Sequence, residues 1–64
     1  MNEDILNQSI RQFLKHVGIH SQRAIEKAAA AAERSGAKSF PATMRLKIDG
    51  LGVDVEFDGE IRME

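Results

Sequence analysis

The sequence predicts an α+β fold, with two N-terminal helices packed on one face of a three-stranded antiparallel β-meander (α-α-β-β-β). Three observations lead to this prediction. Apolar residues alternate with polar ones over the last third of the chain, apolar residues recur at helical spacing before it, and glycines separate the periodic segments. We expect one small domain over residues 1–64, with helices at about 3–17 and 22–35 and strands at about 42–48, 53–57 and 61–64.

The strands are predicted from period-two alternation, which gives a sheet one apolar and one wet face. A loop over residues 49–52 would place Leu46 opposite Val55 and Met44 opposite Phe57. The same register sets Lys47 against Asp54 and Arg45 against Glu56, so that charges of opposite sign also meet.

The dipeptide Asp58-Gly59 is a common turn signal, and we interpret it as the second turn of the meander. A two-residue loop would turn the last strand inside out, because it would pair Val55 with Arg62. A three-residue loop over residues 58–60 instead pairs Phe57 with Ile61 and Val55 with Met63. We therefore expect a loop or bulge at this point.

The first helix is predicted to begin at the N-cap residue Asn2 and to end before Gly18, which we interpret as its left-handed C′ residue. Ser21 would then cap the second helix, which contains an alanine run over residues 28–32. The apolar stripe of the first helix consists of Leu6, Ile10, Phe13, Leu14 and Val17.

Composition limits the classes of function. A chain of 64 residues buries about 60% of its unfolded surface, and without cysteine it has neither disulfides nor thiolate metal ligands. Association with a second copy is the remaining means of stabilisation, so we expect self-association, with a homodimer as the expected form. The acidic start and the short longest apolar run argue against a secretory signal and a membrane span, which predicts a cytoplasmic protein.

Charge is distributed unevenly, although the net charge is only −1. The helical segment 11–38 has a basic excess, and the strands have an acidic one. The basic surface of the helical segment is either a solvated face or a site for an acidic partner. The candidate partner-binding residues are Arg11, Lys15, Arg23, Lys27 and Arg34.

The helix–glycine–helix pattern resembles a helix-turn-helix, in which the next core aliphatic residue usually follows about six positions after the glycine. Here the sixth position after Gly18 is Ala24, and Ile25 comes one position later. Tyr and Trp are absent, so base-stacking platforms are scarce. Nucleic-acid binding through the basic segment is therefore an alternative function, and we expect nucleic acid to be an improbable partner.

No catalytic, cofactor or metal site is expected. His16 and His20 have the four-residue spacing of helical zinc ligands, but a helix that ends at Gly18 would separate them. The carboxylates of the expected turns, among them Asp49, Asp58 and Glu60, occupy exposed positions, whereas acid–base catalysis needs a buried one. We expect the protein not to be an enzyme.

Five stretches of the chain carry a resemblance to a known family. They are residues 1–4, 9–15, 17–28, 50–52 and 58–61. Together they resemble a family of small uncharacterised bacterial proteins, a domain of unknown function. The resemblance implies a bacterial cytoplasmic protein with helices followed by a small sheet, and it implies no activity and no functional residue.

The function that the sequence favours is thus a small non-catalytic protein-interaction module, whose partner is a second copy or an unidentified protein. Neither a membrane, a metal nor a cofactor is expected among its partners.

Overall fold

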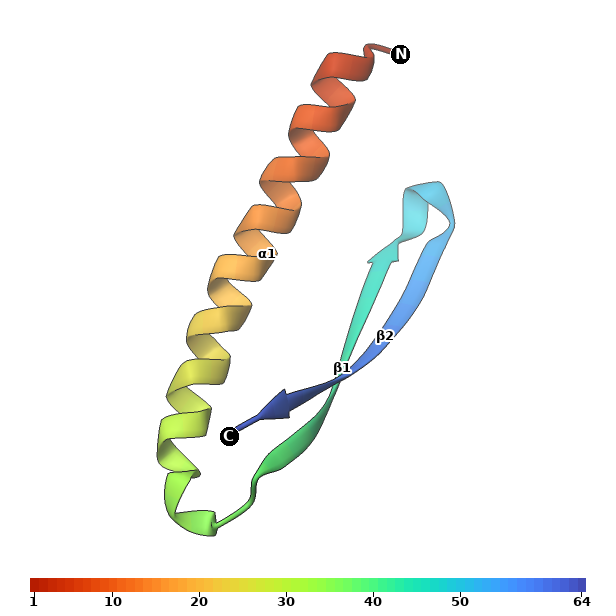
Figure 1. Cartoon of the computed structure of the whole chain (residues 1–64). Helices are drawn as coiled ribbons and strands as arrows, with labels where there is room; N and C mark the ends of the chain where they lie inside the picture. The colour runs from red at the N-terminus through yellow and green to blue at the C-terminus, as the bar shows by residue number, and fades with distance from the viewer. The chain divides into compact units, whose positions relative to one another are not determined.

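A computed structural model describes all residues, 1–64, as two compact units, Met1–Ala32 and Glu33–Glu64. The first unit contains one helix and the second contains one β-hairpin, so the element order is α-β-β (Figure 1). The expected two helices and three-stranded meander are wrong. The single domain expected over residues 1–64 stays a prediction.

Helix α1 runs over Glu3–Ala31. The predicted N-cap is confirmed, because the Asn2 Oδ1 accepts hydrogen bonds from the backbone N–H groups of Asp4 (3.0 Å) and Ile5 (3.1 Å). Glu3 and Asp4 lie in the first turn, where carboxylates interact favourably with the helix dipole.

Helix α1 is continuous (Figure 1). Gly18 lies inside its range and does not end it, which corrects the two-helix prediction. Its φ angle is not positive, so it is not a left-handed C′ residue. A glycine inside a helix costs only about 0.5–1 kcal/mol relative to alanine, which good helix formers on both sides can offset. Apolar residues at helical spacing also continue beyond it, from Val17 to Ala24 and Ala28.

The helix ends in the alanine run. Ala32 is its C-cap, and its N–H donates to the carbonyl groups of residues 28–30. The 3-10 turn η1 follows at Glu33–Ser35, so the predicted helix end near residue 35 falls in a tighter turn. Gly36, with a φ of 79°, supplies the left-handed residue that had been assigned to Gly18.

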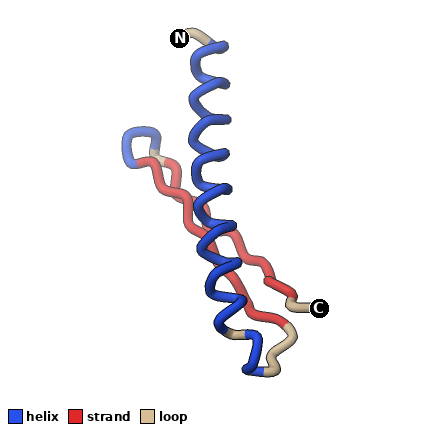
Figure 2. The backbone as a smooth tube through the Cα atoms, turned by 90° about the vertical axis from the view of Figure 1, so that its left-hand side faces the viewer, coloured by secondary structure: helices blue, strands red, loops and turns tan.

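Strands β1 (Ser39–Ile48) and β2 (Val53–Arg62) form one antiparallel two-stranded sheet. Figure 2 shows the two strands side by side along their length and joined at one end by a short turn. The predicted first register is confirmed: Leu46 lies opposite Val55, and Met44 lies opposite Phe57. Alternation therefore located the first hairpin correctly, although β1 begins three residues earlier than expected.

The predicted turn at Asp58-Gly59 does not exist, because β2 continues through both residues. Gly59 lies opposite Ala42, and Ile61 lies opposite Phe40. The pairings expected for a third strand, Phe57 with Ile61 and Val55 with Met63, are therefore wrong. The ladder extends one step further, because the Met63 N–H donates to the Lys38 carbonyl at 2.7 Å.

The single turn of the hairpin is the 3-10 element η2, Asp49–Leu51. Gly52 closes it with a φ of 65°, and its N–H donates to the Asp49 carbonyl at 3.2 Å. A side chain at this position would be strained, so this glycine is required by the turn.

No side chain of the chain is fully buried. A single helix cannot bury its own apolar stripe, and a two-stranded hairpin leaves an apolar face open. Each unit therefore has an apolar face that its own internal contacts do not cover.

Candidate interaction surfaces

The first surface is the apolar stripe of α1, here called the α1 stripe. Its residues recur every three or four positions along one side of the helix. Its larger members are exposed, from 38% for Leu6 to 53% for Leu14, whereas Val17 in the middle is intermediate. The stripe consists of Leu6, Ile10, Phe13, Leu14, Val17, Ser21, Ala24, Ala28 and Ala31.

Side-chain size changes along the α1 stripe. Leucine, isoleucine and phenylalanine occupy its first half, and serine and alanine occupy its second half. Ile25 is the exception, and it lies at the flank of the stripe. Small side chains allow another helix to approach closely, while large ones fill the space between helices. The two halves are therefore complementary in size.

The second surface is the apolar side of the hairpin, here called the hairpin face. All five of its cross-strand pairs join small or apolar residues, with Ala42 and Gly59 in the second pair from the open end. Phe57 is 55% exposed and Met44 is 46% exposed. The hairpin face consists of Phe40, Ala42, Met44, Leu46 and Ile48 from β1 and Val53, Val55, Phe57, Gly59 and Ile61 from β2.

The opposite side of the hairpin carries one well-formed ion pair. Arg45 donates from Nε to Asp54 Oδ1 at 2.8 Å and from Nη2 to Asp54 Oδ2 at 2.7 Å. The pair is diagonal, because the residue directly opposite Arg45 is Glu56 and the residue opposite Asp54 is Lys47. Lys47 instead lies 3.6 Å from the Asp49 carboxylate.

The hydrogen bonds from Arg45 lower the pKa of Asp54, and desolvation opposes this effect. The same bonds raise the pKa of the Arg45 guanidinium. A general acid needs a carboxyl group whose pKa is raised, so the environment of Asp54 acts in the opposite direction. The pair links the two strands on the exposed side of the sheet, and the lowered pKa of Asp54 does not suit it to act as a general acid.

The predicted partner-binding residues fall into two pairs and a single residue. Arg11 and Lys15 are four residues apart on α1, as are Arg23 and Lys27, and members of such pairs are neighbours on a helix surface. Arg34 lies beyond the helix in η1. None of the five forms an ion pair within the chain, and nothing in the structure tests their role.

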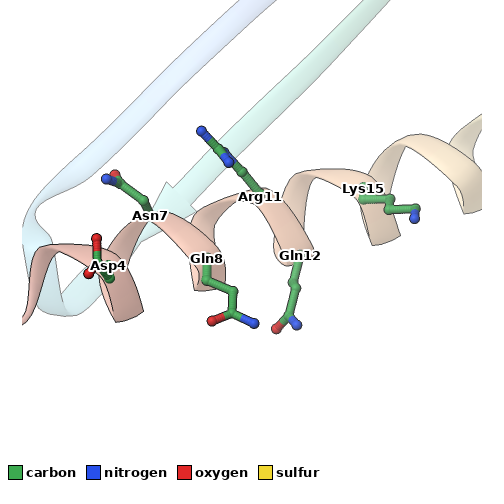
Figure 3. A pocket seen from close by; sticks show the side chains of 6 residues that line it. All are labelled: Asp4, Asn7, Gln8, Arg11, Gln12 and Lys15. Carbon is green, nitrogen blue, oxygen red and sulfur yellow. The ribbon is translucent and has the colours of Figure 1, made fainter.

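A shallow hollow lies on the first half of α1. Figure 3 shows its six lining side chains on one helix, with Gln8 and Gln12 extending to one side and Asn7 and Arg11 to the other. A hollow between side chains of one helix lacks the opposing walls that enclose a small molecule. Its lining residues are Asp4, Asn7, Gln8, Arg11, Gln12 and Lys15.

His16 and His20 lie together, which the sequence argument missed. Their ring centroids are 4.4 Å apart, with the ring planes inclined at 56°. Their predicted separation is wrong, because α1 continues through Gly18. The four-residue spacing was itself the signal, since it places two side chains on one helix face whenever the helix continues.

No helix of the chain combines the length and the apolar character that crossing a bilayer requires.

Comparison with known proteins identifies a family for this chain. No curated protein and no solved structure matches the chain. A family model described as "Family of unknown function (DUF6494)" matches residues 1–64 and confirms the resemblance to a domain of unknown function. The chain therefore belongs to this family over its whole length.

Proposed function

We propose that the protein is a small non-catalytic interaction module that self-associates as a homodimer through the α1 stripe. The observation that carries the proposal is the exposed stripe of a 29-residue helix. Exposed apolar patches of this kind are typical of surfaces that contact another protein. Closed two-fold dimers are the commonest assemblies of one chain with itself.

The size gradient of the α1 stripe supports a second copy in antiparallel orientation. The middle residue of Glu3–Ala31 is Val17, and a fully overlapping antiparallel pair places Val17 against its counterpart. Leu6 then meets Ala28, Ile10 meets Ala24 and Phe13 meets Ser21, so three large side chains each face a small one. A parallel pair would instead set large against large at one end and alanine against alanine at the other.

Charge favours the same orientation. The first turn of α1 carries Glu3 and Asp4, and its last turn carries no basic residue that would balance them. Parallel pairing would bring the two acidic first turns together, whereas antiparallel pairing keeps them apart. The two helix dipoles are also opposed in the antiparallel pair, which lowers their electrostatic energy.

The stabilisation comes from covering apolar surface. Burying a leucine, isoleucine or phenylalanine side chain contributes about 1.5–3 kcal/mol relative to exposure. Each copy contributes several such residues. The free energy gained by burying them must exceed the free-energy cost of the translational and rotational freedom that is lost on association.

Sedimentation equilibrium tests the proposal. The 7.1 kDa chain should sediment at about twice that mass at micromolar concentration. Val17→Lys places two charges against each other at the dimer axis and should give a monomer. Gln12→Lys adds the same charge on the polar side of α1 and should remain a dimer. A wild-type protein that stays monomeric at high micromolar concentration would overturn self-association.

Nucleic-acid binding is the second candidate function. It is favoured by two pairs of cationic residues, Arg11 with Lys15 and Arg23 with Lys27, whose members are neighbours on the helix surface. None of these four residues forms an ion pair within the chain. Binding through phosphates alone is weak and falls steeply between about 50 and 200 mM salt. Sub-micromolar, sequence-selective binding of DNA or RNA at physiological salt, lost in Arg23→Ala or Lys27→Ala, would make this the leading function.

A bacterial source, a cytoplasmic location and the absence of enzymatic activity belong to the same proposal. A chain without cysteine is compatible with a reducing compartment, and the carboxylate with the best-formed partner, Asp54, is held in its charged form.

A further inference from the structure

We propose that His16 and His20 form a two-imidazole binding site for a late first-row divalent cation, such as Cu²⁺, Ni²⁺ or Zn²⁺. Both histidines are exposed on α1, and no other residue of the chain is needed to define the site. Both ligands come from one helix, so a single copy of the chain contains the whole site.

The geometry supports simultaneous coordination. The two rings are one helical turn apart, with centroids 4.4 Å from each other, and they are inclined rather than stacked flat. Metal–imidazole bonds are about 2.0–2.1 Å long, so a cation between two rings at this spacing can reach a nitrogen of each after small rotamer changes. Neither ring donates to or accepts from another group of the chain, so no internal bond has to break.

The ligand set selects the class of cation. Neutral imidazole prefers copper, nickel and zinc, whereas magnesium and calcium prefer oxygen ligands. No third histidine, cysteine or carboxylate lies close enough to complete a cluster. The remaining coordination positions are therefore open to water, and the protein binds the cation as a bidentate ligand through its two imidazoles.

The position of the site gives it a consequence for the helix. His16 and His20 flank Gly18, the residue of α1 with the greatest backbone freedom. A cation held by both rings would link the residues on either side of this glycine. Binding would thus stabilise α1 at its weakest interior point, by the linkage between ligand binding and folding.

The test uses the full chain in metal-free buffer, titrated calorimetrically with CuCl₂, NiCl₂ and ZnCl₂, with MgCl₂ as the control cation. The matched variant is Gln12→His/His16→Gln, which keeps composition and charge but leaves its two histidines eight residues apart. Gln12 and His16 are both exposed, so the exchange should not disturb the helix. Circular dichroism monitors helix content and the melting temperature in each case.

The wild-type protein should bind at most one late divalent cation per chain, in a saturable manner, and its melting temperature should rise. The exchanged variant should bind at least about 10-fold more weakly. Even the loss of a group that hydrogen-bonds to a metal ligand lowers metal affinity by roughly 10–100-fold, and here a ligand itself is moved. The proposal is overturned if the wild type shows no saturable binding at millimolar cation. It is equally overturned if the exchanged variant, with unchanged helix content, binds as tightly.

Discussion

Ala42 lies directly opposite Gly59 in the hairpin register. The two smallest residues of the hairpin face therefore share one cross-strand position. On the same face, the neighbouring pairs are Phe40–Ile61 and Met44–Phe57. Gly59 is thus a strand residue on the apolar side, and its lack of a side chain leaves that face thin at this point.

Gly59→Val should stabilise the hairpin by up to about 1 kcal/mol, since valine favours strands and glycine weakens them. A Cβ at this position meets no atom within 4 Å, so there is room for the larger side chain. The free energy of unfolding from urea denaturation measures the effect. Loss of stability would show that residue 59 lies in a turn.

Gly18→Ala should raise the stability of α1 by about 0.5–1 kcal/mol, because the helix is continuous there and open space surrounds the new methyl group. Gly52→Ala is the contrasting variant, and it should destabilise by roughly 1–2 kcal/mol because Gly52 has a φ of 65°. Thermal melts followed at 222 nm compare the two. Destabilisation by Gly18→Ala would support a helix that ends at that residue.

The Arg45–Asp54 pair should make the hairpin less stable in acid. The pKa of Asp54 is lower in the folded state than its ordinary value, so its contribution is present above about pH 4. The contribution is lost as the pH falls through the folded-state value. Asp54→Asn should therefore reduce the difference in melting temperature between pH 7 and pH 2.5.

Asp58→Asn is the control for this prediction, because Asp58 lies opposite Thr43 and forms no ion pair. It should retain more of the wild-type pH dependence than Asp54→Asn does. Equal responses of the two variants would show that the diagonal pair contributes nothing specific.

Local patterns predicted part of this fold correctly. The Asn2 cap depends on residues 2–5 alone, and the first hairpin register follows from alternation around one glycine-rich turn. Both signals act over a few residues, so no distant contact could override them.

The errors both came from treating a glycine as a boundary. At Gly18 the helical spacing continues on both sides, and at Gly59 the alternation from Val53 to Met63 is unbroken. The continuing periodicity was a stronger signal than the single glycine, because it reflects which residues along the whole element share one apolar face.

The candidate site was predicted only in part. The five cations were identified from charge, and their role stays a prediction. The His16–His20 pair was missed because its geometry depends on whether Gly18 continues the helix.

Spin-label distances between two copies of α1 test the central claim most directly. Because the chain has no cysteine, Gln8→Cys and Lys15→Cys each give one labelling site per chain, and both positions are exposed on the polar side. In an antiparallel pair centred on Val17, the axial separation is about 27 Å for residue 8 and about 6 Å for residue 15. The account predicts a clearly longer distance for the Gln8→Cys label, whereas equal distances, or no dipolar coupling at all, would contradict it.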